Sequence, residues 1–159
     1  YVHDNNLFIL LIINDELELY IFDKSFNKSK NNWNRPGLIY TFEPQFCYTN
    51  SLFLFLHNIS NNVKGIFSDH NFTINQNSVF TTKLNSSEGN TENSRCFTIG
   101  TKFFIFWIGI STKYIYLKII DENATIVKSD TELVKVQNRN FVIQSLETKF
   151  IVFYQKFVN

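Results

Sequence analysis

Several residue types are scarce in this chain, and each scarcity argues against a class of structure. The 159 residues contain one alanine, Ala124. Because alanine is the best helix former, a chain nearly without it is a poor candidate for a helical protein. The longest apolar runs, 7–13 and 103–110, are far shorter than the roughly 20 residues needed to span a bilayer. We therefore expect no membrane span.

An excess of charge of one sign is also lacking. The net charge is +1, and the lysines and arginines are scattered along the chain. A protein that binds nucleic acid electrostatically shows a basic stripe or patch, so nucleic acid is not an expected partner.

Cysteine is nearly absent, with only Cys47 and Cys96. The two do not make a disulfide scaffold, they lack CxxC spacing, and no histidine stands at metal-ligand spacing. We interpret both as small buried hydrophobic residues. The histidines, His3, His57 and His70, share no spacing, and no phosphate loop, nucleophile elbow or metal motif occurs. No metal and no cofactor is expected.

Large apolar and aromatic residues dominate what remains. The chain contains 18 phenylalanines and is 44% hydrophobic, which is enough for a folded core. From Lys113 to Ile119, polar or amphipathic residues alternate with Ile and Leu, the period of a half-buried strand. This pattern predicts strands at 102–110 and 113–120, joined by a tight turn at Ser111-Thr112.

One pattern recurs four times, a polar pair followed by large apolar residues. The copies are NNLFILLI (5–12), NSLFLFLH (50–57), TKFFIFWI (101–108) and TKFIVFYQ (148–155). Their spacing of about 45 to 51 residues predicts a repeated structural unit. We expect hairpins 7–13/17–22 and 52–57/63–67 as counterparts of the one above. We also expect equivalent buried positions, namely Phe8, Phe53, Phe104 and Ile151.

Each unit is predicted to be a meander of four antiparallel strands. After the first and second strands, a third is expected at 38–42, 78–84 and 131–136, and a fourth at 45–49, 95–99 and 141–146. The stretches 27–34 and 85–93 are predicted to be polar loops. The approximate units of the single all-β domain 1–159 are 1–44, 45–94, 95–140 and a partial 141–159.

Units of this size indicate blades of a β-propeller or the three units of a β-trefoil, with another β-barrel or sandwich as a third alternative. Three units fill a trefoil, whereas the long hairpin strands and the partial fourth unit favour a propeller. The chain starts at Tyr1 without a methionine. We expect a piece of a longer protein, or another chain that supplies the remaining blades.

Two turns carry a family resemblance. DHNFTI (69–74) and DENATI (121–126) share Asp-x-Asn-x-Thr-Ile. This resembles the Asp-box of sialidase-like β-propellers, Ser-x-Asp-x-Gly-x-Thr-Trp, with Asn in the glycine position, where it tolerates a left-handed conformation. The Asp and Thr side chains are expected to bond back to backbone amides. DKSFNKS, in the first unit, is a stretched, degenerate version. The predicted structural turn residues are Asp23, Asp69, Asn71, Thr73, Asp121, Asn123 and Thr125.

The resemblance also sets what an enzyme would need. Active sialidases use three arginines, a Tyr–Glu nucleophile pair and an acidic general acid. The chain has three arginines in all, Arg35, Arg95 and Arg139, and no Tyr–Glu pair can be assigned. We therefore predict a non-enzymatic β-repeat scaffold or binding module that engages a protein or glycan, or a structural component of an assembly. The alternatives are a fragment of a sialidase-like glycan-processing enzyme and a trefoil lectin, although the lectin motif Gln-x-Trp is absent.

Five glycosylation sequons occur, where chance would give about three for this composition. The small excess favours a secreted or cell-surface protein, with a cytoplasmic location as the alternative. Three of the five fall in the equivalent turns, where turn chemistry alone would also place Asn and Ser or Thr. The candidate sites are Asn27, Asn58, Asn71, Asn85 and Asn123.

Overall fold

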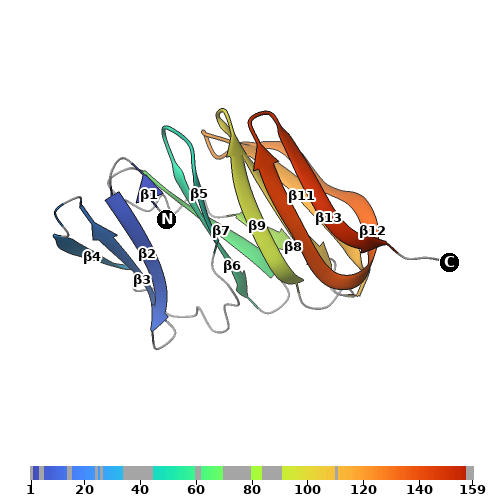
Figure 1. The fold of residues 1–159 in the computed structure, drawn as a ribbon, viewed down its shortest axis with the longest axis horizontal. Coiled ribbons are helices and arrows are strands. Elements are labelled where there is room, and N and C mark those ends of the chain that lie inside the picture. The colour runs from blue at the N-terminus through green and yellow to red at the C-terminus, as the bar shows by residue number, and fades with distance from the viewer. Residues whose placement is uncertain are drawn as a thin grey trace. The chain divides into compact units, whose positions relative to one another are not determined.

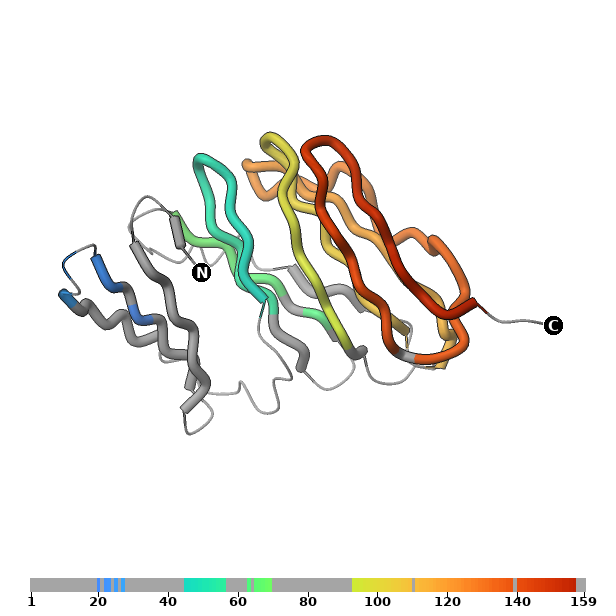
Figure 2. The backbone as a smooth tube through the Cα atoms, viewed as in Figure 1, coloured from blue at the N-terminus to red at the C-terminus, as the bar shows by residue number. Residues whose placement is uncertain are grey.

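In a computed structural model, the chain divides into two compact units, residues 1–41 and 42–159. The path of the chain is drawn in Figure 2. All the elements found in the described residues are β-strands, so the all-β prediction is confirmed. The described residues are 2–3, 6–13, 16–23, 25, 27–33, 45–59, 62–69, 80–83, 91–109 and 111–156.

The first unit contains one sheet with the order β1-β2-β3-β4. Its central hairpin, β2 (Asn6–Ile13) and β3 (Glu16–Phe22), was predicted and is confirmed. β1 (Val2–His3) and β4 (Lys28–Trp33) flank it. β4 corrects the sequence interpretation, which placed a polar loop there. Its backbone pairs with β3 at the edge of the sheet, and edge strands commonly carry polar and charged side chains. The third strand predicted at 38–42 lies outside the described residues.

The second unit begins with the sheet β5-β6-β7-β8. The hairpin of β6 (Phe53–Ile59) and β7 (Asn62–Ser68) matches the predicted one, and β8 (Phe80–Lys83) lies within the predicted third strand. β5 (Gln45–Tyr48) pairs with β6 as the predicted strand at 45–49. The strand order follows the chain order, as a meander requires, but the strand predicted as the fourth of the preceding unit is the first strand of this sheet.

The next sheet has the order β13-β12-β11-β10-β9. The hairpin of β10 (Lys102–Gly109) and β11 (Tyr114–Asp121) confirms the strands predicted from the alternation. Its turn closes where the Lys113 N–H donates to the Gly109 carbonyl oxygen at 2.8 Å. β9 (Thr91–Ile99) starts inside the predicted polar loop 85–93, because its first residues extend the pairing with β10 as far as Gly109.

β12 (Ile126–Leu146) is one strand of 21 residues, where separate strands at 131–136 and 141–146 were predicted. Its first part pairs with β11 and its second with β13 (Lys149–Lys156). The register of the β12–β13 pairing shifts between Val136 and Phe141, near the place where β12 changes partner. The sequence shows two apolar segments, but only the pairing shows that one strand carries both. The β12–β13 hairpin is seen beside β9 in Figure 1.

Two apolar clusters hold the second unit together. The first joins β5–β7 to β9–β11, with Leu54 and Leu56 of β6 packed among Phe103, Ile105 and Trp107 of β10. These side chains are fully buried or nearly so. Burial of such a side chain contributes about 1.5–3 kcal/mol.

The second cluster joins the opposite face of β10 to the β12–β13 hairpin. Phe106 and Ile108 of β10 pack with Phe141 and Ile143 of β12. Phe150 of β13 enters between the rings of Phe97, Phe104 and Phe106, with centroid distances of 5.6, 4.9 and 5.4 Å. Both faces of β10 are therefore covered by other strands, which explains its unusually apolar sequence.

The predicted set of equivalent buried residues is right at Phe53 and wrong at Phe104 and Ile151. Phe53 is buried, but Phe104 is only partly buried and Ile151 is 40% exposed. The strand pairing gives the reason. In the β6–β7 hairpin, Phe53 pairs with Ser68, which directly precedes Asp69. In the β10–β11 hairpin, Phe103 pairs with Ile120, which directly precedes Asp121. Phe103, and not Phe104, is therefore the counterpart of Phe53, and a shift of one residue reverses the face. The side chain of Phe8 lies outside the described residues.

Candidate interaction surface

The β12–β13 hairpin has one face that no described residue covers. We call it the outer face. Paired residues on neighbouring strands point to the same side of a sheet, so the pairs define its members. Val142 is 63% exposed, Leu146 46%, Ile151 40% and Phe153 57%. The six residues of the outer face are Val142, Gln144, Leu146, Lys149, Ile151 and Phe153.

The opposite, inner face of the same hairpin is covered. Phe141 and Ile143 are buried there, and Phe150 and Val152 pack against the second cluster. The hairpin is therefore apolar on both faces. Its outer face is exposed because no described residue packs against it. An exposed cluster of large apolar side chains is typical of an interaction site.

The preceding strands show what covers this position elsewhere in the chain. In the repeat, Ile151 and Phe153 of TKFIVFYQ correspond to Phe104 and Phe106 of TKFFIFWI. Phe106 is 2% exposed because the β12–β13 hairpin covers it. One sheet earlier, Leu54 of β6 is covered in the same way by residues of β9, β10 and β11. The outer face is thus the third member of a series whose first two members are each covered by the next layer.

Two of the predicted structural turns have the same geometry. Asp121 Oδ1 accepts hydrogen bonds from the backbone N–H groups of Asn123 and Thr125, both at 2.9 Å. Asp23 Oδ1 accepts in the same way from the N–H groups of Ser25 and Asn27, at 2.8 and 2.9 Å. In both turns the backbone N–H of the Asp also donates to the carbonyl oxygen of the fourth residue after it, at 3.2 Å for Asp23 and 2.9 Å for Asp121. The turn after Asp23 is therefore not the degenerate version that the sequence suggested, since Asn27 takes the place of Thr125.

The left-handed residue of the second turn is not the predicted one. Ala124 has a φ of 60°, whereas Asn123 was expected to take this conformation. Ala124 N–H donates to the Asp121 carbonyl oxygen at 3.0 Å, and this bond fixes the turn at that residue. Asp69 follows β7, and its side chain is partly buried. Asn71 and Thr73 lie outside the described residues.

The turn after Asp23 also has an electrostatic consequence. The Asn27 side-chain amide donates to Asp23 Oδ2 at 2.9 Å. This bond, followed by the backbone bonds from Asn27 and Ser25, lowers the pKa of Asp23 below its ordinary value. Hydrogen bonds to a carboxylate favour its charged form.

The candidate glycosylation sites differ in their surroundings. Asn123 is exposed at the tip of its turn, whereas Asn27 is exposed but has its amide bonded to Asp23. Asn58 lies in β6, next to the turn into β7, where it pairs with Val63. Asn71 and Asn85 lie outside the described residues.

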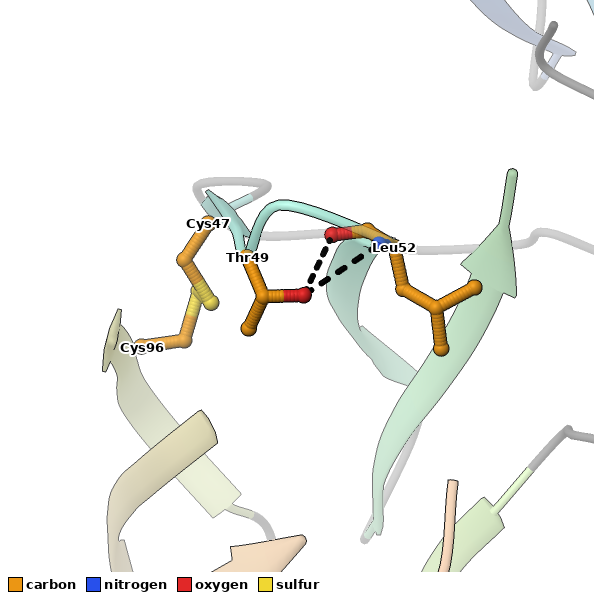
Figure 3. Close-up of a disulfide and its surroundings, with 4 residues drawn as sticks. All are labelled: Cys47, Thr49, Leu52 and Cys96. Carbon is orange, nitrogen blue, oxygen red and sulfur yellow. Dashed lines mark hydrogen bonds between the residues drawn. A yellow bond between two sulfur atoms is a disulfide. The ribbon is translucent and has the colours of Figure 1, made fainter. Parts of the chain in front are cut away.

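Cys47 and Cys96 form a disulfide, which corrects their interpretation as two separate thiols (Figure 3). Both are buried in the first cluster, as expected, and their Cα atoms are 5.8 Å apart. The bond links β5 to β9, the first strands of neighbouring sheets. Beside it, Thr49 Oγ1 accepts a hydrogen bond from the Leu52 N–H at 3.2 Å. The sequence did carry a signal, since the repeat places both cysteines on equivalent strands.

The structure brings together one tyrosine and one glutamate that the sequence could not pair: the Tyr116 hydroxyl lies 3.3 Å from Glu132 Oε1 and 3.1 Å from Thr112 Oγ1. Arg95 lies within β9 and Arg139 within β12, whereas both were expected just before a strand. Arg95 donates to the Ser94 carbonyl oxygen at 3.0 Å. Arg35 and His70 lie outside the described residues, as do the side chains of His3 and His57. Among the described residues, no group of three or more His, Cys, Asp or Glu could hold a metal ion.

A membrane-spanning helix is likewise absent from the residues described, since none forms a helix long and apolar enough. Comparisons of the chain with protein-family models, with curated proteins and with solved structures gave no match.

Proposed function

We propose that this chain is a non-enzymatic β-repeat scaffold that engages a protein partner through the outer face of β12–β13. One observation carries the proposal. Ile151 and Phe153 are exposed at positions whose counterparts in the preceding repeat, Phe104 and Phe106, pack against the next layer. Leaving such side chains in water forgoes about 25 cal/mol for each Å² of apolar surface, and a partner that covers them recovers that stabilisation.

The wider architecture we propose is an array of propeller blades. Three features support it: meanders with strands in chain order, layers that pack face to face, and an apolar face left open at one end. A closed three-unit trefoil would leave no such face uncovered, so the open face favours blades over a trefoil.

We further propose that the protein is secreted or displayed on a cell surface. The Cys47–Cys96 disulfide supports this, because structural disulfides persist in oxidising compartments. The exposed sequon at Asn123 is compatible with the same location. Removal of glycans from the natural protein, followed by mass measurement, tests it. A protein without glycans and with two free thiols in its natural compartment would contradict this location.

The partner surface is tested by photo-cross-linking in cells that produce the protein naturally. A photoreactive phenylalanine analogue replaces Phe153 in one variant and Val127 in the other. Val127 also lies on β12 and is 50% exposed, but it belongs to the part of that strand that pairs with β11 and not with β13. A discrete cross-linked product from position 153 and none from position 127 is expected. No product from position 153 would overturn the proposed function.

A further inference from the structure

We propose that the second unit binds one internal water molecule between the Ser94 hydroxyl of β9 and the Trp107 indole N–H of β10. Ser94 is 1% exposed and Trp107 is 0% exposed. Neither Ser94 Oγ nor Trp107 Nε1 has a hydrogen-bond partner among the described residues. Nearly all buried polar atoms in folded proteins are satisfied by protein groups or by ordered water, because an unsatisfied one costs free energy.

The strand register places these two side chains on the same side of the sheet. Ile105 of β10 pairs with Cys96 of β9, and both face the first cluster. Trp107 lies two residues after Ile105, and Ser94 lies two residues before Cys96. Side chains two residues apart on a strand share a face, and the two strands run antiparallel. Ser94 and Trp107 are therefore cross-strand neighbours, and a single small ligand can reach both polar atoms.

A β-bulge interrupts the strand pair at this point. The register of the β9–β10 pairing shifts between Phe106 and Ile108, so that two residues of β9, Asn93 and Ser94, lie opposite Trp107. Asn93 has a left-handed φ of 54°. A bulge disrupts the regular ladder locally. A buried water makes about three hydrogen bonds, and a backbone carbonyl oxygen of the bulge can accept the third because each carbonyl has two lone pairs.

The chemistry of the two groups selects water over other small ligands. The indole N–H can only donate, whereas the Ser94 hydroxyl can donate or accept, so the ligand must be an acceptor that can also donate. A buried anion would be costly here, because the surrounding first cluster is apolar. Tyr116 stacks on Trp107 with ring centroids 5.7 Å apart, but its hydroxyl lies against Thr112 and Glu132.

The test is thermal unfolding of the full 159-residue chain and its Ser94→Ala variant, followed by Trp107 fluorescence in a Trp33→Phe background. If Ser94 holds the water, the variant should unfold about 2–6 °C lower, because it loses a satisfied hydrogen bond. If the hydroxyl has no partner of any kind, its removal relieves a cost, and the midpoint should stay the same or rise. A midpoint that does not fall would therefore overturn the proposal.

Ser68→Ala is the matched control. Ser68 is also fully buried, but its hydroxyl donates to the Asp69 carbonyl oxygen at 3.2 Å, so its replacement calibrates the loss of one satisfied buried hydroxyl. A crystal structure of the unmodified chain that shows ordered water gives a second test, independent of any variant. One water within about 3.2 Å of both Ser94 Oγ and Trp107 Nε1 is expected. No water there, or a direct bond between the two side chains, would overturn the proposal.

Discussion

The disulfide between Cys47 and Cys96 should be the largest single stabilising feature of the second unit. It closes a loop with a sequence separation of 49 residues. Closure of a loop of this length lowers the conformational entropy of the unfolded chain by an amount worth roughly 4 kcal/mol at 25 °C. Both cysteines also lie in the first cluster, so the bond ties together two sheets that pack through that cluster. Replacement of both by alanine should lower the free energy of unfolding by about 3–5 kcal/mol.

The assay is guanidinium unfolding followed by tryptophan fluorescence. The chain has two tryptophans, Trp33 and Trp107. In a Trp33→Phe background, the signal comes from Trp107 alone, which is fully buried between the sheets and stacks on Tyr116. Comparison of the midpoints, with the slopes checked for agreement, gives the difference in free energy.

Reductant supplies the control. It should destabilise the protein that contains Cys47 and Cys96 by about the same 3–5 kcal/mol and leave the double-alanine variant unchanged. Two outcomes would refute the reasoning. One is a loss below about 1 kcal/mol, which would mean that packing holds the sheets without the bond. The other is titration of two free thiols in denaturant without reductant, which would mean that the bond is not formed.

Three further predictions concern single residues. Ala124→Gly should stabilise the protein by about 0.5–1 kcal/mol, because alanine is strained at a φ of 60°; thermal unfolding measures this, and a loss of stability would contradict it. Phe150→Ala should cost about 3 kcal/mol in chemical unfolding, because Phe150 contacts three rings of the neighbouring layer, whereas Ile151→Ala on the outer face should cost less than about 1 kcal/mol; equal losses would place both on one face. Asp23→Asn should weaken the acid dependence of the first unit. The folded pKa of Asp23 is lowered, so its stabilisation is present above the unfolded pKa and lost as the pH falls through the folded pKa, below about pH 4. Unfolding curves between about pH 5 and pH 2 test this, and identical curves for the two proteins would exclude it.

The hairpins could be predicted from the sequence because their signal is local. Alternation with a period of two and a short polar break specify a strand pair whatever surrounds them, and all three predicted hairpins are observed. The Asp turns are equally local, since Asp121 and Asp23 bond to amides two and four residues away. Even there, the prediction of the left-handed residue was wrong. Side-chain preference favours Asn123, but Ala124 takes this conformation, and its backbone N–H bonds to the Asp121 carbonyl oxygen.

Features that depend on pairing partners were predicted less well. β4 is polar and was predicted to be a loop, yet the edge of β3 pairs with it. β12 contains two apolar segments that read as two strands, yet it runs unbroken because β11 and β13 pair with its two parts. In both cases the partner strand lies on the other side of a turn. The composition of β4 or β12 does not reveal which strand it will pair with.

The local sequence pattern was enough to predict the β-strands, the three hairpins and the Asp turns after two of them. Which side of each strand is covered depended on the packing of the layers. TKFFIFWI and TKFIVFYQ share four of their eight residues and the same apolar pattern over the first seven, yet Phe106 is buried and Phe153 is exposed. The physical reason is that burial belongs to a pair of layers and not to a strand: Phe106 has a layer against it, and Phe153 has none among the described residues. The Cys47–Cys96 bond has the same origin, since stacking of the sheets brings together two residues that the chain keeps 49 positions apart.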